Sequence, residues 1–496
     1  MSHRLAADPV VEPPPYVNRP AGAPARKPQN PAEIPLVEWG SLALRAGRMR
    51  SSRMGEALPH FAWLLRFPEL IGREAIQAEA RRMSATPYGL GRRLAHPRLP
   101  GGRPRWRPSQ ASPPLVFSCV ALAEGAELSA WIDDQLGVRL DPEYDCGWHI
   151  AATHTTGGET VVLVLVHHLF GIARGLVGAI YAGDAEDPTF GTTGLRFDDP
   201  ANDYSARAEL HGLRERFTRG ARGASPSHLR RMTREAAAIR RAAEQRLEGY
   251  APIQPPRGRD RTRRPLSSRR VAAFAFMPAQ VWDETASRWG GTGNTLATAV
   301  AANLLRRARQ ARGGPSARPL QLVLPIDLTR RPDVDRSARV GAGLSAEELM
   351  TTANLVLPGG APVHGDLREI RVRTKAALEA DAATAPTIRG VPDVARLLPE
   401  RVTLYAAYRA AVSFDGCVSN VGELPPGMLR LGPHEASRVV MLGFPIGNEA
   451  LIGLLRYGDQ VSLSAVTDPS RMGRDANLRT WLTEELAAWG LRDVVM

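Results

Sequence analysis

The feature that most constrains the fold is a run of six aliphatic residues, Val161-Val-Leu-Val-Leu-Val166, that leads directly into the pair His167-His168. A strand that is apolar at every position needs cover on both of its faces. The segment 148–154 and a Thr-Thr-Gly-Gly turn precede the run, and this order is typical of a β-hairpin. The sequence therefore predicts a buried hairpin in a layered protein, with two imidazoles at the end of its inner strand.

Segments with strand and helix periodicity alternate along the rest of the chain. Strands are expected over 60–67, 115–121, 270–277, 320–325 and 412–421, with a hairpin over 450–467. Helices are expected over 72–83, 127–136, 173–181, 228–248, 294–312, 365–381 and 481–489, and directly after Pro278. This is an α+β pattern in two sequential halves. No glycine-rich phosphate loop, Gly-x-Ser-x-Gly elbow or His-Glu-x-x-His motif accompanies it, which argues against nucleotide-binding, hydrolase and zinc-protease folds.

The chain is long and apolar enough to fold into more than one unit. It has 496 residues, of which 43% are hydrophobic and 23% charged. The first 35 residues contain nine prolines and no apolar run, which predicts a disordered arm over 1–35. We expect an N-terminal lobe over 36–200 that bears the histidine pair, a basic connection over 201–268 and a C-terminal lobe over 269–496.

Positive charge is concentrated in one segment. Residues 203–270 contain 18 arginines and seven acidic residues, a net charge of +11 out of +13 for the whole chain. A patch of this kind attracts phosphate-bearing small molecules, acidic carrier proteins or nucleic acid, although a solvated helix face is the commonest outcome of such a run. Nucleic acid is the least favoured partner, because aromatic residues are sparse there and no recognised nucleic-acid motif accompanies the arginines.

Three scattered cysteines, Cys119, Cys146 and Cys417, predict neither a disulfide framework nor a metal site. They fit a reducing compartment. The longest apolar stretches are strand-sized, so the sequence predicts no membrane span, although peripheral contact with lipid stays open. The expected location is therefore the cytoplasm.

His167 and His168 are the strongest candidates for chemistry. A histidine at the end of a rigid buried strand is held in place while its ring faces a cavity, as a general base requires. Such a base could take the proton from an alcohol or amine that attacks a thioester. The alternative is that both imidazoles are hydrogen-bonded structural residues at a strand end.

The order of several segments resembles a superfamily of acyltransferases. It includes wax ester synthase/diacylglycerol acyltransferases, polyketide-associated acyltransferases and nonribosomal peptide condensation domains, with the signature His-His-x-x-x-Asp-Gly after a buried strand. Here His167 and His168 match, while Ile172 and Ala173 replace the Asp and Gly. Further similar segments are 64–67, 101–106, 140–148, Thr292-Gly-Asn-Thr295, Leu324-Pro-Ile-Asp-Leu-Thr-Arg330, Val418-Ser-Asn-Val-Gly422 and the late Asp468.

The resemblance implies two chloramphenicol-acetyltransferase-like α/β lobes in a V, with a tunnel between them and His168 at its middle. It implies no bound cofactor or metal: acyl-CoA or a carrier protein's phosphopantetheine thioester is the co-substrate, and a small-molecule hydroxyl or amine the acceptor. His168 would be the base and His167 mainly structural. Ser419, Asn420 and Asn294 are candidates for stabilising the oxyanion or lining the cleft. Their alternative roles are a Ser or Asx turn for the first two and a helix N-cap for Asn294.

The two substitutions in the signature leave other functions open. In the family the Asp mainly forms an internal ion pair, so Ile172 indicates an apolar replacement and leaves Arg174 for another partner. The methyl group of Ala173 narrows a substrate path or forbids a positive φ angle. A binding or scaffold protein that retains the cleft is therefore one alternative to an acyltransferase, and a condensation or cyclisation enzyme of a biosynthetic pathway is another.

Overall fold

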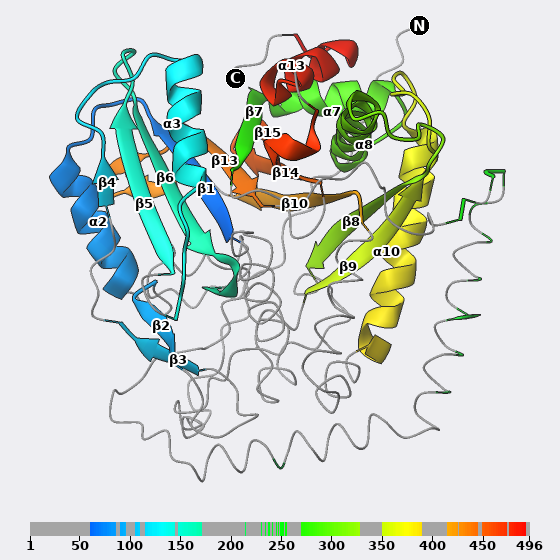
Figure 1. The fold of residues 1–496 in the computed structure, drawn as a ribbon, viewed down its shortest axis with the longest axis horizontal. Helices are drawn as coiled ribbons and strands as arrows, with labels where there is room; N and C mark the ends of the chain where they lie inside the picture. The colour runs from blue at the N-terminus through cyan, green and yellow to red at the C-terminus, as the bar shows by residue number, and fades with distance from the viewer. Residues whose placement is uncertain are drawn as a thin grey trace, which may run out of the picture.

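Two larger β-sheets with helices packed against them form a mixed α/β architecture (Figure 1). The structure is a computed structural model. It describes residues 60–85, 90–95, 105–109, 115–143, 147–170, 269–327, 350–388, 414–424, 426–444, 449–473 and 476–492, with scattered positions between 214 and 254.

The first sheet has five strands in the order β13-β1-β6-β5-β4. Their bounds are β1 His60–Phe67, β4 Leu115–Phe117, β5 Trp148–His154, β6 Thr160–His167 and β13 Arg438–Gly443. β5 and β6 form the predicted antiparallel hairpin, and every residue of β6 is buried. Helix α2 (Arg73–Ala85) packs on one face and helix α3 (Ala126–Leu136) on the other, which explains why the inner strand is apolar throughout.

The second sheet has six strands in the order β7-β15-β14-β10-β8-β9. Their bounds are β7 Val271–Pro278, β8 Leu320–Asp327, β9 Met350–Leu357, β10 Gly416–Leu424, β14 Ala450–Tyr457 and β15 Gln460–Thr467. The helices that pack on it are α7 Ala279–Arg288, α8 Gly293–Ala311, α10 Arg368–Ile388 and α13 Leu478–Ala488. All four contribute to one apolar core with the same sheet face, which leaves the opposite face toward the first sheet.

Strand β13 joins the two sheets. It belongs to the second half of the sequence, yet it pairs antiparallel with β1, with Phe61 opposite Gly443. The hydroxyl of Ser464 in β15 donates a hydrogen bond of 2.6 Å to the carbonyl oxygen of Met441 in β13. Gly453 in β14 permits this close crossing, because a Cβ there would lie 2.6 Å from the Ser464 hydroxyl oxygen.

Helix α3 also connects the halves. The Asp133 carboxylate accepts hydrogen bonds from the backbone N–H of Ala272 in β7, at 2.9 Å, and from the Arg479 guanidinium in α13, at 2.8 Å. Burial raises the pKa of Asp133, and the Arg479 hydrogen bond opposes this shift. α3 is therefore attached to both sheets by polar contacts as well as by its apolar face.

Smaller elements complete the described fold. Strands β2 (Arg92–Ala95) and β3 (Arg105–Pro108) form one two-stranded sheet, and β11 (Arg430–Leu431) and β12 (His434–Glu435) form another. Two short 3-10 helices, η2 (His168–Phe170) and η5 (Pro469–Arg471), follow β6 and β15.

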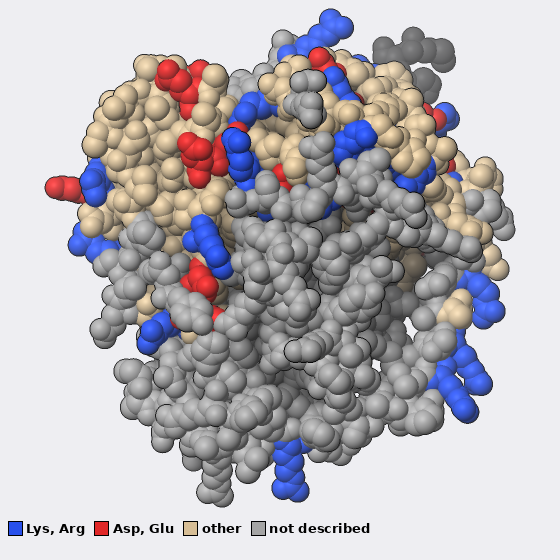
Figure 2. All heavy atoms as spheres, in the orientation of Figure 1, with Lys and Arg blue, Asp and Glu red and all other residues tan. Residues whose placement is uncertain are grey.

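Few positions of the basic connection lie among the described residues. Arg230, Arg234 and Arg241 are helical and exposed. In Figure 2, Lys and Arg side chains project from the lower right edge of the molecule. Two described residues of the basic connection contact α10: the Arg373 guanidinium donates a 2.8 Å hydrogen bond to the carbonyl oxygen of Ala251 and lies 5.8 Å from the Tyr250 ring.

The predicted elements agree with most of the described ones. The strand expected over 115–121 is shorter, because β4 ends at Phe117. The longer strands β9 and β13 and the short strands β2, β3, β11 and β12 were not predicted. The helix expected over 173–181 lies outside the described residues. The mixed α/β class is confirmed, whereas the V of two lobes, the tunnel and the domain boundaries stay predictions.

Candidate active site

The histidine pair lies where β6 ends and η2 begins. His167 is the last residue of the strand and is fully buried, and its backbone N–H donates a 2.8 Å hydrogen bond to the carbonyl oxygen of Gly147. His168 opens η2 and keeps part of its surface exposed. Its ring meets the Phe61 ring of β1 at right angles, with 5.8 Å between centroids.

The two imidazoles have different surroundings. Side chains alternate between the faces of a strand, so His167 continues the row of Leu163 and Leu165 toward α3. His168 has left the strand and lies beside Phe61, which belongs to the core cluster on the α2 side. His167 is therefore enclosed on the α3 side, whereas His168 lies on the α2 side and is only partly covered as a residue.

Both imidazoles are neutral near pH 7. Burial, together with the neighbouring His60 and His168, holds the pKa of His167 well below its usual range. Burial also lowers the pKa of His168, whose ring is densely surrounded although its residue is not fully covered. A neutral imidazole has a free electron pair on one nitrogen and can accept a proton, as a general base must.

The remaining signature positions, Ile172, Ala173 and Arg174, lie outside the described residues. How the substituted half of the signature is arranged is therefore still a prediction.

Ser419 and Asn420 lie on β10 of the second sheet, whereas His168 follows a strand of the first. The Asn420 side-chain oxygen accepts a 2.8 Å hydrogen bond from the backbone N–H of Gly422, at a bulge where Gly422 adopts a φ of 86°. The Asn420 side chain thus has the turn role that was its alternative to lining the cleft. Ser419 is partly exposed.

Asn294 does not cap helix α8. The cap is Thr292, whose hydroxyl accepts a hydrogen bond of 3.3 Å from the backbone N–H of Thr295. Asn294 is the second residue of the helix, and its carbonyl oxygen accepts from the Thr298 hydroxyl at 2.8 Å. The N-cap role that was the alternative for Asn294 therefore belongs to Thr292.

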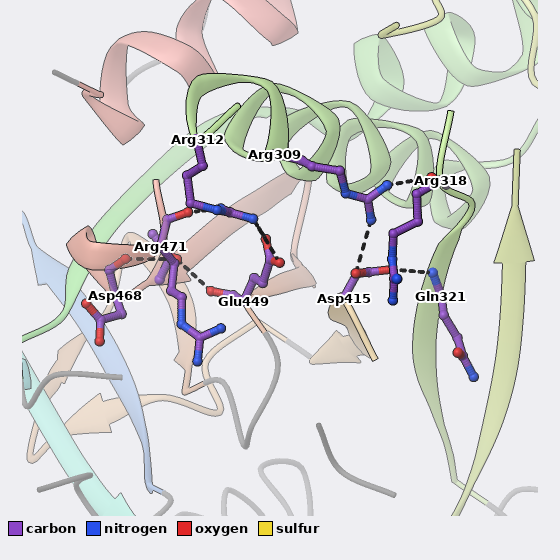
Figure 3. A network of polar contacts seen from close by, with 9 residues as sticks. Arg309, Arg312, Arg318, Gln321, Asp415, Glu449, Asp468 and Arg471 are labelled. Atoms are coloured by element: carbon purple, nitrogen blue, oxygen red, sulfur yellow. Dashed lines mark hydrogen bonds and ion pairs between the residues drawn. The ribbon is translucent and has the colours of Figure 1, made fainter. Parts of the chain in front are cut away.

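A buried network of ion pairs lies where several strands of the second sheet begin or end (Figure 3). Arg309 of α8 pairs with Asp415 at 3.1 Å, with both side chains at most 2% exposed. Arg312 donates to both carboxylate oxygens of Glu449 at 3.0 Å. Asp415 immediately precedes β10 and Glu449 immediately precedes β14, so the network fixes the strand ends. No sequence motif predicts this network, although arginines within the apolar α8 segment are a usable signal.

Asp468 belongs to the same region. It follows β15, is fully buried, caps η5 by accepting a 2.8 Å hydrogen bond from the backbone N–H of Ser470, and lies 3.7 Å from Arg270. These contacts give it a structural role.

The described cysteines are reduced, with Cys119 exposed and Cys417 buried, and burial raises the pKa of the Cys417 thiol to about 12. Across the described ranges, no group of three or more His, Cys, Asp or Glu side chains is placed to hold a metal ion. No described helix combines the length and the apolar character that crossing a membrane requires.

Neither a scan of protein-family models nor a search of curated proteins gives a match. Solved structures do match. The wax ester synthase/diacylglycerol acyltransferase from Marinobacter aquaeolei VT8 is 15% identical with a TM-score of 0.51, over 92% of this chain and 99% of that one. The first condensation domain of the calcium-dependent antibiotic synthetase, solved with a substrate analogue, is 13% identical with a TM-score of 0.51, over 93% and 98%.

The nonribosomal peptide synthetase FmoA3 is 16% identical with a TM-score of 0.50, over 94% of this chain but only 45% of that one. At these identities the likeness establishes the fold alone. The chain therefore has the fold shared by wax ester synthase/diacylglycerol acyltransferases and condensation domains, as the resemblance in the sequence predicted.

Proposed function

We propose that this protein is an acyltransferase that moves an acyl group from a thioester donor to a hydroxyl or amine, with His168 as general base. The observation that carries the proposal is a neutral imidazole directly after a fully buried strand, within a fold shared with an acyltransferase. The two sheets would be the lobes of the V, and the tunnel between them would bring donor and acceptor to His168.

The reaction requires one proton acceptor at the attacking atom. The imidazole of His168 takes the proton from the acceptor O–H or N–H while the oxygen or nitrogen bonds to the thioester carbonyl carbon. The carbon–sulfur bond then breaks, and the leaving thiolate takes the proton back from the imidazolium. The transient oxyanion needs a hydrogen-bond donor, a role proposed for the Ser419 hydroxyl. The net products are an ester or amide and a free thiol.

The donor is proposed to be acyl-CoA or an acyl carrier protein. Both carry phosphate on the pantetheine arm, and guanidinium groups bind phosphate bidentately. The exposed Arg230, Arg234 and Arg241 of the basic connection are the described groups that support this choice.

The test is His168→Ala assayed against panels of acyl-CoAs and acyl carrier proteins, with free thiol as the readout. Loss of a general base is expected to lower kcat by about 100- to 10,000-fold while unfolding stays cooperative. His434→Ala is the matched control, because His434 is a partly exposed histidine paired at 2.7 Å with Glu69, whose carbonyl oxygen accepts a hydrogen bond from Thr160 at the other end of β6 from His168. Full activity of His168→Ala rejects the mechanism.

A second candidate follows from the replaced Asp and Gly of the signature, at Ile172 and Ala173. These changes favour a non-catalytic binding or scaffold protein, or an enzyme that catalyses condensation or cyclisation. The same panels separate the candidates, because a scaffold binds a donor without releasing thiol.

A further inference from the structure

His60 lies against the histidine pair although it is 107 positions before His167 in the chain. It is the first residue of β1 and stands directly opposite His167 in the antiparallel pairing with β6. Its side chain is buried, and its Nε2 lies 3.3 Å from the carbonyl oxygen of Leu136, the last residue of α3. Because a carbonyl oxygen only accepts, Nε2 carries the hydrogen, and this contact fixes both the tautomer and the ring orientation.

A face of the His60 ring is also occupied. The Phe444 ring lies at a centroid distance of 3.8 Å with a tilt of 35°. Phe444 directly follows β13, the strand that joins the two sheets. The His60 imidazole is therefore fixed between the end of α3 and the end of the joining strand.

Two consecutive residues of β1, His60 and Phe61, lie beside His167 and His168. His60 faces His167 across the strands, and the Phe61 ring contacts the His168 ring edge-on at 5.8 Å. No residue separates His167 from His168, so a displacement of one is carried directly to the other. The start of β1 thus lies beside both histidines.

We propose that His60 is a positioning residue for His168. Through its contacts with Leu136 and Phe444, His60 holds His167 and the first turn of η2 in place. This inference rests on the function proposed for His168. It assigns no contact between His60 and a substrate.

Two further histidines near His60 have pKa values that burial lowers. The imidazoles on this side of the sheet end are His60, His149 and His167, and the Nε2 of His149 lies 3.2 Å from the side-chain oxygen of Gln135 in α3. Burial lowers the pKa of His149, as it does that of His167. Neutral imidazoles at His149 and His167 need no counter-ion beside His60.

The chain contains a matched control in His154. It ends β5 at the opposite end of the same hairpin, its Nε2 lies 3.0 Å from the carbonyl oxygen of Ile71, and its ring meets Phe117 edge-on at 5.3 Å. His60→Ala and His154→Ala therefore remove the same kind of contacts, but only the first lies beside the histidine pair. His60→Gln retains an N–H donor for Leu136 and serves as the conservative variant.

The experiment compares kcat, KM and the NMR resonances of the His168 ring in the three variants and the unmodified protein. We expect His60→Ala to lower kcat by about 10- to 100-fold with KM nearly constant, the effect of misplacing a reacting group by about 1 Å. His60→Gln should recover part of this loss. His154→Ala should leave kcat within about two-fold and the His168 resonances unchanged.

Equal kcat values for His60→Ala and the unmodified protein, or equal losses in His60→Ala and His154→Ala, would overturn the positioning role. If His60→Ala does not fold, the same criteria apply to His60→Gln. Failure of the proposed function is distinguishable, because His168→Ala would then retain activity. In that case the NMR comparison alone decides the positioning role, and His168 resonances that His60→Ala leaves in place would contradict it.

Discussion

Buried titratable groups lie at one end of each sheet, and the two sheets accommodate them in different ways. In the first sheet His149 and His167 are kept neutral, and burial lowers the pKa of each. In the second, Arg309 and Arg312 are paired with Asp415 and Glu449 at 3.0 to 3.1 Å, in almost complete burial. Neutrality avoids the desolvation cost of a charge, whereas pairing offsets that cost only while both partners are present.

The largest effect is expected from breaking a pair in the second sheet. Asp415→Ala removes the carboxylate opposite Arg309 and the acceptor for the backbone N–H of Gln321, at 2.7 Å. Removing one partner of a buried pair should lower the free energy of unfolding by about 3 to 5 kcal/mol, measured by chemical denaturation. The double variant Asp415→Ala with Arg309→Met should lose less, and a double variant that is less stable than the single one contradicts this account.

An intermediate effect is expected from pH in the first sheet. The folded pKa values of His149 and His167 are depressed, so the unfolded chain binds protons first as the pH falls below about 6.5. Stability should therefore be fully present above that pH and fall by up to about 1.4 kcal/mol per pH unit for each histidine.

Denaturation curves at about pH 7.5, 6.5 and 5.5 measure the slope. His167→Leu should reduce it, whatever the variant's absolute stability. A slope unchanged in that variant would assign the pH dependence to other groups.

The smallest effect is expected from an exposed ion pair. Arg307 and Glu484 lie 2.5 Å apart on α8 and α13, with side chains 37% and 53% exposed. Glu484→Ala should cost at most about 1 kcal/mol, and added salt should reduce that cost. A loss as large as that of Asp415→Ala would show that burial is not what distinguishes the two pairs.

Much of the fold follows from local sequence patterns. The bounds of β1 and β5 were predicted, and those of β6 to within one residue at each end, because apolar residues predominate in all three strands. β13 was missed because it is short and its partner β1 is more than 370 positions away, a pairing that no local periodicity encodes. The place of His168 at a strand end was likewise predictable from local sequence.

The surroundings of His168 were not predictable in the same way. His60 and Phe444 meet only through tertiary pairing, and the arginines of α8 find their carboxylates on loops more than 100 positions later. The capping residue of α8 was misassigned by two positions, since Thr292 and Asn294 are both acceptable caps from sequence.

The pairing of β13 with β1 has a consequence for how the protein is made. Strands β1, β4, β5 and β6 have all been synthesised once the nascent chain reaches residue 167. The edge of β1 that pairs with β13 stays open until residue 443 has left the ribosome. During that interval an apolar strand edge is open to other chains. Translation products truncated between these points should aggregate, and chaperone binding should be strongest on them.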